Sequence, residues 1–545
     1  MSSLRKRVVG GRFVAVALIA LWAVEAAAME SPFHRRIKVA EFPEGLQWIN
    51  VARPLELKSL RGKFVLLDFW TYCCINCMHI LPELKKVEKA YANELVVIGV
   101  HSAKFENERD SQNIIAAAQR YEIGHPVIND SDHVFWERFG VQAWPTLILI
   151  DPEGYGVWGT SGEVTFEQLD KVLRAGVAYY AHKGLLRREP LAIDRAGPPQ
   201  SPSPLRFPGK VLADEAGHRL FIADSNHNQI VVARLDGQVL DVIGAGSVGR
   251  RDGDYQTAQF NHPQGMALDG AMLYVADTEN HLLRKIDLTR KRLTTIAGLG
   301  HQGREPAALG HLGLPLQTAL SSPWDLTIAG SSLYIAMAGW HQIWRMPLSE
   351  SGIGPYAGNG REDIVDGPLL PRTPYAEGFA SFAQPSGLTT DGTRLYVADS
   401  EGSSIRAVPL QPHGSVTTIT GTAHLAQARL FTFGDRDGDH FEARFQHPLG
   451  LVWYENLLYV ADTYNHKIRV VDPGDGSART LVGSGQRGHS DDPPSFDEPC
   501  GIAAAGGKLF VADTNNHLIR VIDLRAGNKV STLQIKGQPA VGASQ

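Results

Sequence analysis

The sequence predicts two domains in tandem, an α/β domain followed by an all-β propeller of six blades. The α/β prediction rests on the stretch 64–180, where apolar runs of strand length alternate with amphipathic helical patterns. The propeller prediction rests on a short strand motif that recurs six times after residue 219, at spacings of 51 to 63 residues. A chain of 545 residues is also too long for a single compact core.

Composition and charge exclude several classes of protein. Hydrophobic residues make up 43% of the chain and charged residues 20%, which rules out a disordered polymer. A net charge of −5, without a long basic tract beyond the N-terminus, argues against a sequence-independent nucleic-acid surface. With only four cysteines, no disulfide framework holds the chain together. Cys73, Cys74 and Cys77 form a cluster, and Cys500 stands alone.

Residues 1–28 have the pattern of a secretory signal peptide. Basic residues at 5–7 and 12 precede the uncharged run 13–24, and the alanines at 26–28 offer a cleavage site. Twelve residues rise only about 18 Å as a helix, which is short for a hydrocarbon core about 30 Å thick. We therefore expect an exported, periplasmic protein with no membrane span after cleavage. An uncleaved N-terminal anchor is the alternative.

The first domain is expected over residues 40–182. Strands are expected at 64–70, 95–100 and 146–150, and helices at 78–91, 112–121 and 166–180. Cys74 and Cys77 form a C-x-x-C sequence where the first strand gives way to the first helix. The free N–H groups and dipole of a helix N-terminus favour a thiolate there, and a second thiol one turn later can resolve a mixed disulfide. A structural zinc site would need a second ligand pair, and the sequence has none of suitable spacing.

This part of the chain resembles the thioredoxin superfamily. The letters DFW at 68–70 precede the C-x-x-C, WPT at 144–146 precedes a late strand, and LRGKFVLLDFW at 60–70 is similar to the exported TlpA/ResA-like branch. The resemblance implies that Asp68 is a buried proton relay and that Pro145 is a cis proline facing the cysteines. An ordinary strand-end carboxylate is the alternative for Asp68.

Two features depart from that superfamily. Cys73 replaces the aromatic residue that usually precedes the nucleophile, and Ile75-Asn76 separates the two sulfurs without a proline. The third thiol, on Cys73, is either a reactive side-partner or a small buried filler. The altered dipeptide leaves the redox potential open.

The second domain is expected over residues 205–537, after a linker at 183–204 that is rich in proline at 198–204. The motif reads LFIAD at 220–224, and its copies begin at 273, 333, 395, 458 and 509. Each copy follows a Pro-x-Gly-type element, and only the third copy lacks both the glycine and the aspartate. Four short strands in each of six units are expected to close radially into a β-propeller.

The phrases ADTYNHKIR at 461–469 and ADTNNHLIR at 512–520 resemble NHL repeats, which implies a six-bladed NHL propeller. Asp, Asn, His and Arg recur at equivalent places in several units, so we assign them to the architecture. A metal or catalytic site near the axis would need His or acidic residues that break the repeat, and no such cluster stands out. The run DRDGD at 435–439 has its glycine misplaced for an EF-hand. The sequence predicts no metal site and no cofactor.

The double-cysteine motif and the order of the domains resemble the NHL repeat-containing protein 2 family, in the form of an exported bacterial member. The hypothesis that follows is a thiol-disulfide oxidoreductase in which Cys74 attacks, Cys77 resolves, Asp68 relays the proton and Pro145 shapes the docking groove. The expected partners are a protein with a disulfide or dithiol, recruited by the propeller, and a redox donor or acceptor protein. Two alternatives stay open: an interaction scaffold whose thioredoxin fold is only structural, and a propeller-based lyase or hydrolase.

Overall fold

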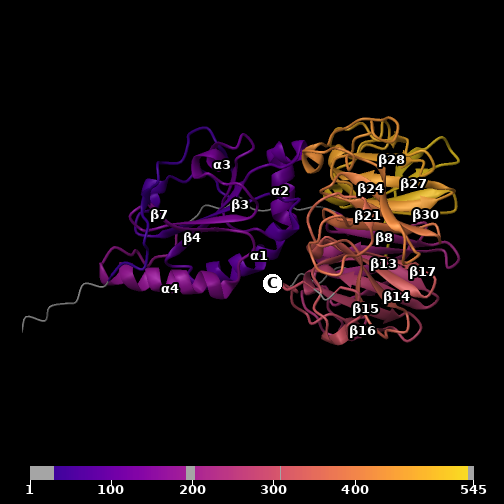
Figure 1. Cartoon of the computed structure of the whole chain (residues 1–545), viewed down its shortest axis with the longest axis horizontal. Coiled ribbons are helices and arrows are strands. Elements are labelled where there is room, and N and C mark those ends of the chain that lie inside the picture. Colours follow the sequence, from indigo (N-terminus) through magenta and orange to yellow (C-terminus); the bar gives the residue numbers. More distant parts are fainter. Residues whose placement is uncertain (1–29, 192–202, 307–308, 538–545) are drawn as a thin grey trace, which may run out of the picture.

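The computed structural model describes residues 30–191, 203–306 and 309–537. An α/β domain precedes a six-bladed β-propeller, which confirms the predicted fold class (Figure 1). The predicted signal peptide lies outside the described residues, and so do residues 192–202 of the predicted linker. None of the helices within the described ranges is long and apolar enough to cross a membrane.

A seven-stranded sheet forms the centre of the α/β domain. Its strands are β1 (Ile37–Lys38), β2 (Gln47–Ile49), β3 (Phe64–Trp70), β4 (Leu95–His101), β5 (Val127–Asn129), β6 (Thr146–Ile150) and β7 (Tyr155–Ser161). They lie in the order β1-β7-β6-β3-β4-β5-β2, with β3 parallel to β4 and antiparallel to β6. β3 and β4 are buried along their whole length, as expected for central strands covered on both faces.

Four α-helices in the described part of this domain cover the sheet. They are α1 (Ile75–Ala90), α2 (Ser111–Arg120), α3 (Val134–Phe139) and α4 (Phe166–His182). Because side chains alternate along β3, Phe64 and Leu66 join the core with α1 and α4, whereas Val65 and Phe69 join the core with α3. The predicted helices at 112–121 and 166–180 correspond to α2 and α4. α1 begins three residues before its predicted start, because Cys74 caps it.

Each blade of the propeller is an antiparallel sheet made from one contiguous stretch of chain. Blade 1 contains β8 (Pro208–Asp214), β9 (Arg219–Asp224), β10 (Gln229–Arg234) and β11 (Val239–Ile243); blade 2 contains β12 (Gly253–Asp254), β13 (Pro263–Asp269), β14 (Met272–Asp277), β15 (Leu282–Asp287) and β16 (Arg292–Ala297); blade 3 contains β17 (Pro323–Ala329), β18 (Ser332–Met337), β19 (Gln342–Pro347) and β20 (Gly354–Ala357). Blade 4 contains β21 (Gly367–Pro368), β22 (Pro385–Thr390), β23 (Arg394–Asp399), β24 (Ser404–Pro409) and β25 (Ser415–Thr420); blade 5 contains β26 (Gly450–Tyr454), β27 (Leu457–Asp462), β28 (Lys467–Val471) and β29 (Ala478–Val482); blade 6 contains β30 (Pro499–Ala505), β31 (Lys508–Asp513), β32 (Leu518–Asp523) and β33 (Lys529–Thr532).

The recurring Asp and Arg side chains form a buried ion pair inside four of the blades. The Asp ends the second long strand of the blade, and the Arg lies on the neighbouring strand. The pairs are Asp277–Arg284, Asp399–Arg406, Asp462–Arg469 and Asp513–Arg520. In blade 3, Met337 and Trp344 occupy the two places, which explains why that copy of the motif looks degenerate.

A residue with positive φ joins each blade to the next one. Its side chain accepts a backbone N–H hydrogen bond from the following blade. The donor is the residue just before the proline at the entry to the first long strand of that blade. The pairs of acceptor and donor are Asn228 and His262, His281 and Ser322, His341 and Gln384, Ser403 and His447, His466 and Glu498, and His517 and Phe207. The last pair connects blade 6 to blade 1 and thereby closes the ring.

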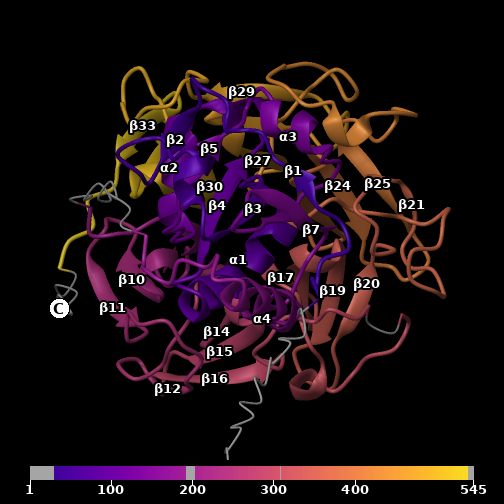
Figure 2. The ribbon, with the colours of Figure 1, turned by 90° about the vertical axis from the view of Figure 1, so that its left-hand side faces the viewer.

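The α/β domain lies over one end of the propeller axis. Figure 1 shows the two domains side by side, with α1 and α2 facing the propeller. Figure 2 looks from the side of the α/β domain and shows α1, β3 and β4 in front of the centre of the ring of blades. This arrangement brings the start of α1, where the cysteines lie, against the propeller.

Candidate functional site

The dithiol lies in the loop that leaves β3 and enters α1. Cys74 is the N-cap of α1, and its Sγ accepts a hydrogen bond from the Cys77 N–H at 3.4 Å. Both residues are free thiols and both are buried, with 7% of Cys74 and 1% of Cys77 exposed. Burial, reinforced by the neighbouring Cys74 sulfur, raises the pKa of the Cys77 thiol well above its usual value. A helix N-terminus favours negative charge, and the raised pKa of Cys77 favours the protonated form of its thiol.

Asp68 lies in β3 and is fully buried. Neither of its carboxylate oxygens has a hydrogen-bond partner among the described residues. Burial raises the pKa of Asp68 to about 7. The charge of Glu88 adds to this effect, and the charge of His125 opposes it. The negative charge of Asp68 in turn contributes to the raised pKa of Cys77. A carboxyl that titrates near neutral pH beside a thiol can accept the thiol proton.

Pro145 lies at the same end of the sheet as the cysteine loop. The Trp144–Pro145 peptide is cis. Thr146, the first residue of β6, pairs with Phe69 of β3, so Pro145 lies where the chain leaves β3 toward the dithiol. The Trp144 Nε1 donates a hydrogen bond to the Ser102 carbonyl oxygen at 3.0 Å, which anchors the residue before the proline.

Cys73 has the surroundings of a packed core side chain. It is fully buried, and its Sγ lies 3.9 Å from the Thr71 Oγ1. Its backbone N–H donates to the Glu108 carboxylate at 2.9 Å. Burial raises the pKa of the Cys73 thiol well above its usual value, and the nearby charge of Glu108 raises it further. This environment keeps the third thiol protonated.

The propeller covers the dithiol, which the sequence did not predict. The side chain of Gln384 in blade 4 accepts a hydrogen bond from the Ile75 N–H and donates one to the Cys73 carbonyl oxygen, both at 2.9 Å. In blade 3, the Ser322 hydroxyl lies 2.8 Å from His79 Nε2 on α1. Polar contacts from two blades therefore hold the first turn of α1 and the cysteine loop.

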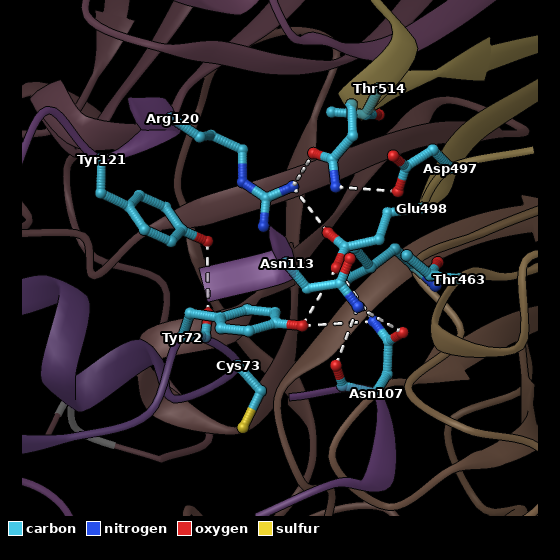
Figure 3. A network of polar contacts seen from close by, with 12 residues as sticks. Tyr72, Cys73, Asn107, Asn113, Arg120, Tyr121, Thr463, Asp497, Glu498 and Thr514 are labelled. Atoms are coloured by element: carbon cyan, nitrogen blue, oxygen red, sulfur yellow. Dashed lines mark hydrogen bonds and ion pairs between the residues drawn. The ribbon is translucent and has the colours of Figure 1, made fainter. Parts of the chain in front are cut away.

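A further group of contacts surrounds Glu498 of blade 6 (Figure 3). Its carboxylate accepts hydrogen bonds from the Tyr72 hydroxyl at 3.1 Å, the Asn107 amide at 3.0 Å and the Arg120 guanidinium at 3.0 Å. Glu498 is 1% exposed, so its ion pair with Arg120 is a buried charge pair between the domains. The Cys73 sulfur points away from this network (Figure 3).

The propeller residues that make these contacts share one position in the repeat. Each directly precedes the proline at the entry to the first long strand of its blade and has a positive φ, and the residue type changes around the ring. We call this set the pre-proline ring: Phe207, His262, Ser322, Gln384, His447 and Glu498. The members differ in residue type from blade to blade, so no repeated motif marks this cluster in the sequence. The signal that could have revealed it is a column of differing residues beside an unchanging proline.

A cavity of about 110 Å³ lies between α1 and the pre-proline ring. Ile75 and Met78 line it from α1, and Trp324 and Cys500 line it from the propeller. Across the described ranges, no group of three or more His, Cys, Asp or Glu side chains is placed to hold a metal ion.

Known proteins share either the first domain or nearly the whole chain. The family described as Thioredoxin-like matches residues 62–155. NHL repeat-containing protein 2 of Homo sapiens is 42% identical over 536 residues, which cover 92% of this chain and 72% of the human protein. Protein SUPPRESSOR OF QUENCHING 1, chloroplastic, of Arabidopsis thaliana is 44% identical over 518 residues, which cover 92% of this chain and 48% of that protein. Thiol-disulfide oxidoreductase YkuV of Bacillus subtilis (strain 168) is 28% identical over 107 residues, which cover 20% of this chain and 72% of that protein. The first domain is thus distantly related to thiol-disulfide oxidoreductases.

Proposed function

Because the chain belongs to the NHL repeat-containing protein 2 family and carries two free thiols at the head of a helix, we propose that it is a thiol-disulfide oxidoreductase. The observation that carries this proposal is the placement of Cys74 and Cys77 in the first turn of α1, with the buried carboxyl of Asp68 beside them. The distant relationship of the first domain to a thiol-disulfide oxidoreductase supports the same chemistry.

The proposed reaction is a pair of thiol-disulfide exchanges. The Cys74 thiolate attacks one sulfur of a substrate disulfide, forms a mixed disulfide and releases the other substrate sulfur as a thiolate, which takes a proton from water. Cys77 then passes its proton to Asp68 and attacks the Cys74 sulfur. This step forms the Cys74–Cys77 disulfide and releases the second substrate sulfur as a thiolate, which takes a proton from water. Pro145, at the same end of the sheet, shapes the surface on which the substrate chain lies.

The direction and the partners are part of the proposal. The substrate is a protein with a disulfide or a dithiol that the propeller recruits, and a separate redox donor or acceptor protein restores the Cys74–Cys77 pair. The reduction potential of this pair, measured by equilibration with glutathione, decides whether the protein reduces or oxidises its partner. The leader pattern at 1–28 leads us to propose export to the periplasm, and N-terminal sequencing of the protein isolated from cells would detect its cleavage.

Substitution of the two cysteines tests the proposal. We expect Cys74→Ser to abolish reduction of insulin disulfides by the full-length protein, because the attacking sulfur is lost. We expect Cys77→Ser to accumulate a mixed disulfide through Cys74, visible by non-reducing electrophoresis and mass spectrometry. The matched control is Cys500→Ser, a buried thiol of blade 6, which should retain the activity. If the wild-type protein neither reduces nor oxidises a protein disulfide, the proposal fails.

The burial of the dithiol beneath the propeller favours a second candidate function, a non-catalytic interaction scaffold. In that case the α/β domain only stabilises the face of the propeller, and the thiols are packing residues. The two candidates differ in the effect of Cys74→Ser in cells: a scaffold keeps its phenotype, and an oxidoreductase loses it.

A further inference from the structure

Gln384 is the member of the pre-proline ring that contacts the cysteine loop from both sides of Cys74. Its backbone has a φ of 62°, its side chain is 1% exposed, and its own N–H donates to His341 Nδ1 at 3.0 Å. The inter-blade hydrogen bond therefore holds the Gln384 backbone, and the buried side chain extends to the loop before α1.

The side-chain amide of Gln384 satisfies the two peptide groups that flank Cys74. Its Oε1 accepts from the Ile75 N–H, and its Nε2 donates to the Cys73 carbonyl oxygen. The backbone groups of Cys74 itself are satisfied locally, since its N–H donates to the Thr71 carbonyl oxygen and its carbonyl oxygen accepts from the Cys77 N–H. The propeller thus supplies the partners that the loop lacks, and buried peptide groups need such partners.

A primary amide of this length meets both demands, because its oxygen accepts and its nitrogen donates. A carboxylate would accept from the Ile75 N–H but repel the Cys73 carbonyl oxygen. A thioether would leave both peptide groups unpaired. The requirement is specific to this blade, since the other ring positions carry Phe, His, Ser, His and Glu.

We propose that Gln384 is a positioning residue of the thiol-disulfide site, contributed by the propeller to the α/β domain. By holding the peptides on either side of Cys74, it sets the direction of the attacking sulfur and keeps the contact neutral. The inference rests on the proposed function and goes beyond it, because it makes the propeller part of the reactive site. The charged or titratable groups near this loop include Glu401 and Glu362 with their shared partner Lys104, Glu108 and Asp68.

The test compares Gln384→Glu and Gln384→Met in the full-length protein. For Gln384→Glu we expect the pH profile of Cys74 alkylation by iodoacetamide, followed by mass spectrometry, to move about one pH unit upward, because a negative charge would then lie beside the two peptides that flank Cys74. For Gln384→Met we expect the rate of insulin reduction to fall about tenfold or more with a smaller change in the pH profile. The matched control is Gln411→Glu, the same substitution on an exposed turn of the same blade, which should match the wild type.

A third variant, Gln384→His, separates an effect on Cys74 from a failure of the protein to fold. Gln384→His carries a residue found at the same ring position in blades 2 and 5, as His262 and His447, with the same positive φ. Near-wild-type alkylation profiles and rates in all three Gln384 variants, with the wild type active, would overturn the inference and leave the proposed function intact. If the wild type has no disulfide activity, the proposed function fails, and the alkylation profiles still decide whether Gln384 acts on Cys74.

Discussion

Asp68 lies two residues before the end of β3 and six residues before Cys74. Its position in a buried strand follows from the apolar run that surrounds it, so the sequence was sufficient to place the carboxyl inside the domain. The absence of a hydrogen-bond partner for either oxygen among the described residues, and the raised pKa of about 7, depend on how the strands and helices pack around it.

The pKa of Asp68 makes a prediction about stability. Between about pH 4 and pH 7 the folded protein keeps a proton on Asp68 that the unfolded chain has lost, so this residue makes the fold less stable as the pH rises. In Asp68→Asn we expect this loss to disappear. The free energy of unfolding should exceed that of the wild type by an amount on the order of 4 kcal/mol at pH 8 and should differ little from it at pH 4. Urea unfolding at both pH values measures it.

The same variant tests the role of Asp68 as a base. In the wild type the resolving step should accelerate as the pH rises through 7, and in Asp68→Asn it should be slower and lack that inflection. Asp132→Asn, an exposed carboxyl of the same domain, serves as the control. A wild-type and an Asp68→Asn protein with the same pH profile would remove Asp68 from the mechanism.

At the scale of elements, the propeller depends on a contact that is repeated from blade to blade. His517, with a φ of 59°, accepts the Phe207 N–H through Nδ1 at 2.9 Å and connects the last blade to the first. Burial lowers the pKa of His517 to about 4, and the charge of Arg206 adds to this effect. The neutral ring is the form that can accept this hydrogen bond.

Substitutions at His517 should separate the hydrogen bond from the side-chain volume. We expect His517→Ala to lower the free energy of unfolding by about 2–4 kcal/mol. The substitution removes the hydrogen-bond acceptor, and it leaves alanine at a positive φ that non-glycine residues rarely adopt. His517→Asn should cost less than half of that, because Asn228 performs this role between blades 1 and 2. Urea unfolding of both variants measures the difference, and equal costs would contradict the assignment.

The pH dependence of the same contact has a defined sign. The pKa of His517 in the folded protein lies below its usual value of 6.5. The neutral ring therefore contributes fully to the stability of the fold above pH 6.5, and this contribution is lost as the pH falls toward 4. The asparagine variant should lack this part of the acid sensitivity.

Blade 3 shows that the buried ion pair is replaceable as a unit. Where the four blades with the ion pair carry Asp and Arg, it carries Met337 and Trp344, both fully buried. Charge pairs in protein interiors gain little over well-packed apolar groups of similar volume, whereas the loss of one partner leaves a costly unpaired charge. The two changes in blade 3 therefore belong together.

At the scale of the whole molecule, buried polar contacts hold the α/β domain on the propeller. Lys104 is nearly fully buried between Glu401 and Glu362 of blade 4, and Arg120 pairs with Glu498 of blade 6. These charged groups come from opposite domains, so separation of the domains would expose them to water and the dithiol to partners. We expect the stability of this docking to set how often the thiols become accessible.

Removal of one docking charge should expose the dithiol. Glu498→Ala leaves Arg120 buried without its partner, a change that costs on the order of 3–5 kcal/mol in protein interiors. We expect native-state alkylation of Cys74 and Cys77 to become at least tenfold faster than in the wild type. The control is Glu442→Ala, which breaks an exposed ion pair with Arg436. Unchanged alkylation in Glu498→Ala would show that this contact does not limit access.

The sequence by itself determined both domains and the place of the dithiol, because the signals are local. Apolar runs of strand length that alternate with helical patterns, a C-x-x-C sequence where a strand gives way to a helix, and the recurring blade motif are each carried by a short stretch of the chain. The strands β1, β2, β5 and β7 and the short helix α3 were missed, and all of these except β7 have two to six residues, which are too few to show a period.

Only the tertiary structure decided what faces the dithiol. Gln384 lies 309 residues from Ile75 in the chain, and Glu498 lies 426 residues from Tyr72. Such contacts arise where the α/β domain packs over the axis of the closed ring, and no periodicity in the sequence encodes that packing. The physical reason is that a repeat specifies a blade through short-range contacts, whereas a variable blade-entry residue such as Gln384 or Glu498 has its partner in the other domain.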